Sequence, residues 1–233
     1  MKVIRSSLLE GARSARGTAV VVDVFRAFSC TPLLFSLGVR HSVLVAAPEE
    51  ALRLKSQDEE LILIGEVGGV PVEGFDLGNS PSQILRRGAE FFKGKAVVQR
   101  TSAGVQGALA ALEAADEVLL GSFMVARATA GYLKARAPEE VSLIAMGVQL
   151  KEKAPEDEWC TRYLAHLLDG TEYDHNLALR EIIFQETTQK FLRRDKAHFP
   201  AEDPILCLQR DIYDFVLKVT RQENLVVVNK EEI

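Results

Sequence analysis

The sequence predicts a three-layer α/β/α fold with a mostly parallel or mixed central sheet and a helix-rich C-terminal part. Two observations predict it: short runs rich in valine, leucine and isoleucine recur through the first two thirds of the chain, and segments with helical spacing separate most of them. Parallel strands need crossover connections, which helices supply. The 233-residue chain has no low-complexity linker or repeat, so residues 1–233 are expected to form a single domain.

Six apolar runs have the length and composition of buried strands. They are Ala19–Val24, Ser42–Ala46, Leu61–Ile64, Ala96–Gln99, Glu117–Leu120 and Val141–Ala145. The helices expected between them are Pro48–Lys55, Pro81–Phe92, Val105–Ala115 and Met124–Ala135. After Pro155 the spacing predicts helices over Asp157–Leu168, Leu177–Phe191 and Asp203–Val219, followed by a short apolar run at Leu225–Val228.

Composition argues against several classes of protein. The chain is 47% hydrophobic and 26% charged, and no apolar run approaches the roughly 20 residues of a membrane span, so no membrane partner is expected. The basic N-terminus lacks an apolar signal segment, which predicts a cytoplasmic protein. A net charge of -5 without a Lys/Arg stripe argues against nucleic acid as a partner. Three cysteines without CxxC spacing argue against a disulfide framework or a zinc knuckle.

Unusual polar residues follow most of the expected strands. They are Asp23, Arg26, Glu66, Arg100, Thr101, Ser102, Ser122, Glu156 and Asp157. Because the carboxyl ends of parallel strands share one edge of a sheet, where ligands usually bind, these side chains are expected to share a pocket.

The acids among these residues predict a hard cation. Oxygen donors without a histidine or cysteine cluster suit Mg²⁺ better than Zn²⁺, and the predicted metal ligands are Asp23, Glu66, Glu156 and Asp157. For Glu156 and Asp157, a role as solvated loop acids is an equal alternative. Asp23 alternatively caps a turn, with Arg26 as its ion-pair partner.

Two segments have features of an anion site. Ser80 and Pro81 have the pattern of a helix N-cap followed by proline, and the unpaired N–H groups of such a helix start suit a phosphate as well as a simple cap. The turn 101–107 combines hydroxyls with glycines but lacks the lysine of a P-loop. The predicted substrate-binding residues are Asn79, Ser80, Arg100, Thr101, Ser102, Gly104, Gln106 and Gly107.

Four stretches, taken together and in order, resemble the 2-phosphosulfolactate phosphatase family. They are VVVDVFRAFSCTPLLFSLG, GEVGGVPVEGFDLGNSPSQI, QRTSAGVQGALAA and PEDEWCTRYLAHLLDG, within residues 1 to 175. The resemblance implies an α/β, Mg²⁺-dependent phosphatase that hydrolyses (R)-2-phospho-3-sulfolactate to 3-sulfolactate and phosphate, a step of coenzyme M biosynthesis. Matched by position, it marks Asp23, Arg26, Glu66, Asp76 and the acid pair 156–157.

These residues lead to a hypothesis of metal-assisted hydrolysis of a phosphate monoester. Asp23, Glu66 and Asp157 would hold Mg²⁺, while Arg26 and the turn 101–107 would stabilise charge on the transferred group. Asp23, Arg26 and Asp76 are the predicted catalytic residues, with Asp76 either supporting the metal ligands or acting as the base for the attacking water.

The alternative is a non-catalytic binder of small phosphorylated or sulfonated anions on the same fold. It is motivated by Val67, which stands where the resemblance implies an arginine, and by Met124-Val125, which stands where it implies an asparagine. A hydrolase of the isochorismatase kind ranks last, because it shares only the Asp-terminated first strand. The sequence also allows a homodimer.

Overall fold

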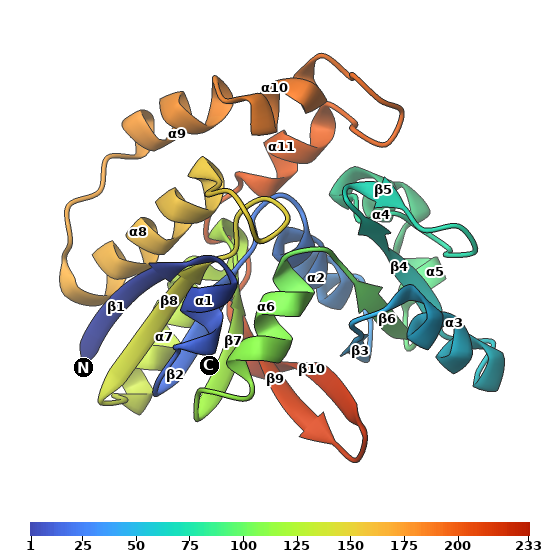
Figure 1. Cartoon of the computed structure of the whole chain (residues 1–233), viewed down its shortest axis with the longest axis horizontal. Helices are drawn as coiled ribbons and strands as arrows, with labels where there is room; N and C mark the ends of the chain where they lie inside the picture. Colours follow the sequence, from blue (N-terminus) through green and yellow to red (C-terminus); the bar gives the residue numbers. More distant parts are fainter.

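The computed structural model describes residues 1–233, and its centre is a ten-stranded mixed sheet (Figure 1). The strands are β1 (Lys2–Ser7), β2 (Thr18–Val22), β3 (His41–Leu44), β4 (Ile62–Val67), β5 (Val70–Pro71), β6 (Ala96–Arg100), β7 (Glu117–Gly121), β8 (Glu140–Ala145), β9 (Phe215–Gln222) and β10 (Leu225–Glu232). Their order across the sheet is β1-β8-β2-β7-β9-β10-β3-β6-β4-β5. Strands form at all six predicted runs, and the predicted α/β class is confirmed.

Helices cover both faces of the sheet. They are α1 (Leu8–Arg13), α2 (Ala27–Ser36), α3 (Pro48–Gln57), α4 (Pro81–Arg87), α5 (Ala89–Phe92), α6 (Gly104–Ala111), α7 (Ala126–Arg136), α8 (Pro155–Asp169), α9 (His175–Ile183), α10 (Glu186–Leu192) and α11 (Glu202–Cys207), with a 3₁₀ turn at Phe123–Val125. Successive residues of β2 show the two faces: Val21 packs in a cluster with Ala108 of α6, and Val20 packs with Leu133 of α7 and Leu164 of α8. No helix has the length and apolar character needed to cross a membrane.

The C-terminal end of the chain differs from its prediction. The helix expected over Asp203–Val219 is wrong, because α11 ends at Cys207 and β9 starts at Phe215. Leu217 packs on one face of the sheet and Val216 on the other, which is the alternation of a central strand rather than of a helix. The tail is therefore helix-rich only to Cys207, and it closes with a hairpin in the middle of the sheet.

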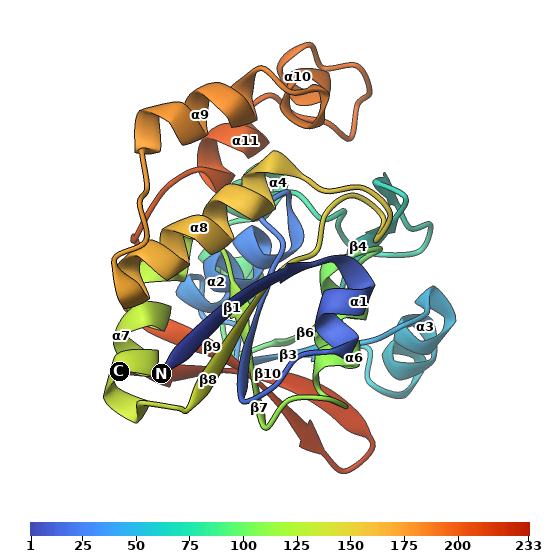
Figure 2. The ribbon, with the colours of Figure 1, turned by 60° about the vertical axis from the view of Figure 1, so that its left-hand side comes forward.

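Other boundaries also move. Gly88, with a φ of 74°, separates α4 from α5 within the helix expected over Pro81–Phe92, since a left-handed residue ends a helix. The helix expected over Leu177–Phe191 is divided into α9 and α10. Strand β1 and helix α2 were not predicted. In Figure 2, α9, α10 and α11 form a group of helices beyond α8.

The β9–β10 hairpin joins two parallel blocks of the sheet. Strands β1, β8, β2 and β7 are parallel to one another, as are β3, β6 and β4, and the hairpin is antiparallel to its neighbours on both sides. The pairing rules alone would place the carboxyl ends of β2 and β6 at opposite edges. Instead the two ends meet, as a hydrogen bond of 2.8 Å from the Gly104 amide after β6 to Asp23 after β2 shows. Five strand-to-strand steps of roughly 20–25° each accumulate a rotation of more than about 100°, which brings these ends together.

Replacing Leu217 by alanine tests the central position of the hairpin. Leu217 is fully buried, and its truncation leaves a cavity, so we expect the free energy of unfolding to fall by about 2–5 kcal/mol. Ile205→Ala, at an exposed apolar position of α11, should change it by less than about 0.5 kcal/mol. Urea unfolding followed by the fluorescence of the single tryptophan, Trp159, measures both. Equally small effects would contradict the central placement of β9.

Candidate active site

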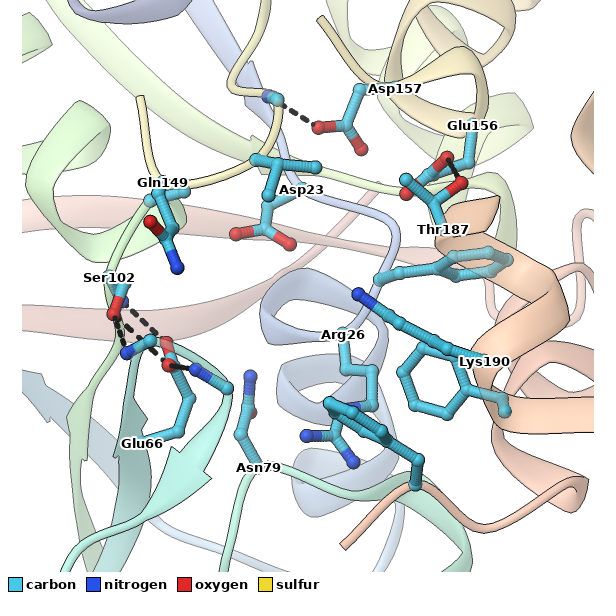
Figure 3. Close-up of a pocket in the computed structure, with 18 residues that line it drawn as sticks. Asp23, Arg26, Glu66, Asn79, Ser102, Gln149, Glu156, Asp157, Thr187 and Lys190 are labelled. Carbon is cyan, nitrogen blue, oxygen red and sulfur yellow. Dashed lines mark hydrogen bonds between the residues drawn. The ribbon is translucent and has the colours of Figure 1, made fainter. Parts of the chain in front are cut away.

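A pocket lies where the ends of β2, β4 and β6 meet the start of α8 and the helix α10 (Figure 3). Several residues predicted from the sequence line it together. They are Asp23, Arg26, Glu66, Asn79, Ser102, Glu156 and Asp157. The position of polar residues just after strands therefore correctly predicted that side chains distant in sequence share one pocket.

Asp23 occupies the junction between the two halves of the sheet. Its carboxylate accepts hydrogen bonds from the backbone N–H groups of Ala27 in α2, at 3.3 Å, and Gly104 in α6, at 2.8 Å. Position 104 requires glycine, because a Cβ atom there would lie 2.6 Å from Asp23 Oδ2. Asp23 thus caps the turn at the start of α2, as the alternative predicted, but its pairing with Arg26 is wrong, since Arg26 forms its ion pair with Asp203.

The acid pair 156–157 lies in the first turn of α8, where carboxylates suit the positive end of the helix dipole. Asp157 Oδ1 accepts from the Val24 amide at 2.7 Å, and Oδ2 accepts from the Gly147 amide at 2.8 Å. Glu156 Oε2 accepts from the Thr187 hydroxyl at 3.2 Å. Glu156 is 3% exposed and Asp157 2% exposed, so the alternative of solvated loop acids is wrong.

Burial and mutual repulsion shift the titration of these acids. Burial raises the pKa of Asp23 to about 7, and the charge of Glu66 adds to the shift. Burial likewise raises the pKa of Glu156 to about 7. The pKa of Asp157 is well above its usual range, first through burial and then through repulsion from Asp23 and Glu156. The nearby protein groups therefore do not fully compensate the negative charge of these three carboxylates.

Glu66 connects two turns of the pocket wall. Its Oε1 accepts from the Ser102 amide at 2.5 Å, and its Oε2 accepts from the Gly69 amide at 2.5 Å and the Ser102 hydroxyl at 3.0 Å. Gly68 and Gly69 have φ values of 59° and 85°, which glycine adopts without strain. Three protein donors therefore fix this carboxylate between the β4–β5 turn and the start of α6.

Arg26 is held in place by the C-terminal segment. Its Nη1 donates to Asp203 Oδ2 and to the His198 carbonyl, both at 2.9 Å. Asp203 is fully buried and also accepts from the Ser80 hydroxyl at 2.9 Å and the Ser82 amide at 3.0 Å. This carboxylate, which the sequence did not mark, joins α11, the start of α4 and Arg26.

Some predicted residues lie outside the pocket. Asp76 accepts from the Leu63 amide at 2.8 Å and from Lys55 Nζ at 3.3 Å, beside β4. The Ser80 hydroxyl caps α4 by accepting from the Gln83 amide, so this helix start forms as predicted while its hydroxyl also donates to Asp203.

The turn that follows β6 divides in the same way. Ser102 lines the pocket, and the Gly104 amide supports Asp23. Arg100 and Gln106 do not line the pocket. Arg100 donates to the carbonyls of Ala46 and Glu66 and to the Ser102 hydroxyl, and Gln106 donates to the Ala46 carbonyl. Thr101 accepts from an amide of α6. Gly107 permits close contact with a methionine side chain. The backbone and Ser102, rather than every polar side chain of the turn, face the site.

Residues of the C-terminal segment complete the pocket and were not predicted. They are Thr187, Lys190, Phe191 and Phe199. Helical spacing indicates that α10 forms, but it does not indicate which other element the helix packs against. The sequence therefore held no signal that this segment reaches the pocket.

The donor set fits a hard cation. Asp23, Glu156 and Asp157 supply buried oxygens whose negative charges repel one another, and Asn79 Oδ1 is buried without a hydrogen-bond partner. No three His, Cys, Asp or Glu residues are close enough together to hold a metal ion by themselves. Mg²⁺ commonly uses one or two carboxylates, with waters and substrate phosphates as its other ligands. The residues present fit a site of that kind.

Fold and pocket together define an α/β protein with an acid-rich ligand site, faced by cationic side chains, at the ends of its parallel strands. The sequence profile of the 2-phosphosulpholactate phosphatase family matches residues 4–222. The chain belongs to this family, as its motifs predicted, and is accordingly a phosphoric monoester hydrolase.

Relatives from several bacteria share this similarity. A protein of Bacillus subtilis (strain 168) is 29% identical over 214 residues, covering 91% of this chain and 90% of the relative. A protein of Caldicellulosiruptor saccharolyticus is 37% identical over 153 residues, covering 64% and 61% of the two chains. A Thermus thermophilus protein is 35% identical over 145 residues, covering 62% and 59%. Each is named "Probable 2-phosphosulfolactate phosphatase".

Asp203→Ala tests whether the buried ion pair supports the site. The substitution leaves Arg26 buried without its carboxylate, so we expect the free energy of unfolding to fall by about 3–5 kcal/mol. Glu202→Ala is the matched control, because its ion pairs with Arg86 and Arg194 are exposed, and it should cost less than about 1 kcal/mol. Urea unfolding gives both values. A loss at Asp203 no larger than at Glu202 would show that the buried pair is not needed.

Proposed function

We propose that the protein is a Mg²⁺-dependent phosphatase of a small 2-hydroxy acid, which hydrolyses (R)-2-phospho-3-sulfolactate to 3-sulfolactate and phosphate. The observation that carries the proposal is the buried set of acids at Asp23, Glu156 and Asp157, which faces Arg26 within one pocket. The names of the relatives support the choice of substrate.

Asp23 and Asp157 would hold the cation. Each of their oxygens accepts one backbone N–H, which leaves a lone pair on each for a further bond. When bound, Mg²⁺ would neutralise charge on the phosphate oxygens and increase the acidity of a coordinated water. The amides that hold Asp23 and Asp157 keep both carboxylates oriented before a ligand arrives.

Arg26 and Glu156 have the remaining roles. Only Nη1 of Arg26 is bonded within the protein, so Nε and Nη2 can donate to oxygens of the transferred phosphoryl group. Glu156 has a pKa near 7 through burial, which suits a group that accepts a proton from the attacking water at neutral pH. Asp76, the base considered from the sequence, binds Leu63 and Lys55 outside the pocket, and this role is therefore assigned to Glu156.

The alternative of a non-catalytic binder has lost its motivation. Val67 is 47% exposed and outside the pocket lining. Met124 and Val125 are buried in the protein core, also outside the pocket. These three positions thus leave the acids and the cations of the pocket in place.

Metal removal and an Asp23→Asn substitution test the proposal together. With 2-phospho-3-sulfolactate as substrate, we expect a chelator to abolish phosphate release and added Mg²⁺ to restore it. Asp23→Asn should lower kcat by at least about 100-fold, because it removes the charge that would hold the metal. Glu73→Gln, an exposed acid of the β5–α4 loop, should keep full activity. Undiminished turnover in chelator, or in a folded Asp23→Asn protein, would refute the mechanism.

Glu156→Gln separates the proposed proton acceptor from a structural acid. The amide keeps the bond to Thr187 but cannot take a proton at neutral pH, so we expect kcat to fall by about 100-fold or more with KM little changed. Because a buried negative charge is removed, the melting temperature in chelator should rise by about 3 °C, the shift that about 1 kcal/mol produces in a chain of this size. Steady-state assays and calorimetry measure the two effects. A lower melting temperature together with unchanged kcat would mean that Glu156 only supports the fold.

A further inference from the structure

The pocket has a second cation that the proposed chemistry leaves unused. Lys190 lies on α10 and lines the pocket together with the acids. In Figure 3 its side chain extends into the space between Asp23 and Arg26. Its ammonium group forms no hydrogen bond or ion pair, and its contacts are with the faces of Phe191 and Phe199, at 5.4 and 5.2 Å from the ring centroids. Three donors thus remain for a ligand.

Contacts with the rest of the pocket hold α10 in this position. Thr187, one helical turn before Lys190, donates to Glu156 Oε2, and residues three apart lie on the same side of a helix. Phe191, the next residue after Lys190, is 3% exposed. The same anchored side of the helix therefore presents Lys190 to the pocket.

Lys190 and Arg26 share one aromatic wall. Arg26 Cζ lies 5.2 Å from the Phe191 ring centroid and 5.9 Å from that of Phe199, so both cations contact the same two rings. Burial lowers the pKa of Lys190, and repulsion from Arg26 acts in the same direction although Glu156 opposes it. Two partly desolvated cations on one wall form a favourable environment for a ligand that carries more than one anionic group.

We propose that Lys190 binds the sulfonate of the substrate proposed above, which carries a carboxylate and a sulfonate in addition to its phosphate. This assignment rests on the proposed function, because that function supplies a substrate with a sulfonate. An ammonium is a compact charge with three rotatable donors, so it suits a group with three equivalent oxygens and no preferred plane. Lys190 is thus a specificity-determining residue, and the phosphate is left to the acids and Arg26.

A pair of substrates tests the proposal. For Lys190→Met we expect KM for 2-phospho-3-sulfolactate to rise by about 10- to 100-fold, the value of one charge-assisted hydrogen bond, with kcat little changed. With 2-phospholactate, which lacks the sulfonate, KM should stay within about 2-fold of the wild-type value, since no partner of Lys190 is lost. Lys190→Arg keeps the charge and should recover part of the affinity. Lys196→Met removes an exposed lysine of the same segment and should leave both substrates unaffected. Equal losses on both substrates, or no loss on either, would overturn the role of Lys190.

Binding of the product separates this proposal from the phosphatase proposal. By calorimetry, wild-type protein should bind 3-sulfolactate more tightly than lactate, and Lys190→Met should remove that preference while the protein stays folded. If this occurs without phosphate release by the wild type, Lys190 still binds the sulfonate and the proposed reaction is refuted. If phosphate is released but Lys190→Met keeps the preference for 3-sulfolactate, the reaction holds and the assignment of Lys190 fails. A wild-type protein with no preference also overturns it.

Discussion

The hydrogen bond from the Gly104 amide to Asp23 joins the two halves of this fold. Asp23 follows a strand of one parallel block and Gly104 follows a strand of the other, and the two meet only because the sheet rotates strongly through its central hairpin. Glycine is required at this point because any side chain would displace the carboxylate. The positions of Glu66 and Ser102 depend on the same junction, since their bonds connect the turns after β4 and β6.

The site is also defined by an unequal division of charge. Buried carboxylates collect where backbone amides can orient them, and each amide bond offsets part of the cost of burying a negative charge. The cations Arg26 and Lys190 lie over the rings of Phe191 and Phe199 and come partly from the C-terminal segment. Arg26 bridges the two regions, because it follows β2 but is paired with Asp203 of α11. Loss of that pair would affect the position of the cation as well as stability.

The sequence predicted the parts of the fold that are specified by local patterns. Buried strands appear as apolar runs, and the acids at the ends of β2 and β4 and at the start of α8 line one pocket, as expected. It did not predict β9, because neighbours on both faces, rather than local spacing, make Phe215–Val219 a central strand. Lys190 and Asp203 were missed for a related reason: helical spacing does not specify the element against which a helix docks. Asp76 was marked as a catalytic residue by its motif, but its carboxylate accepts a hydrogen bond from the backbone of β4 outside the pocket.

The valine at position 67 does not leave the pocket without a second cation, because the C-terminal helices supply one. From the sequence, Val67 replaces a cation that would help to bind a phosphate and a sulfonate together. In the folded protein Val67 is exposed outside the pocket, while α10 brings Lys190 to the same wall as Arg26. A binding site depends on where a charged side chain lies, and not on which helix, strand or loop carries that side chain. The ends of β2 and β4 and the start of α8 therefore provide the acids of the pocket, whereas the C-terminal segment provides Lys190, to which we assign the selection of the substrate.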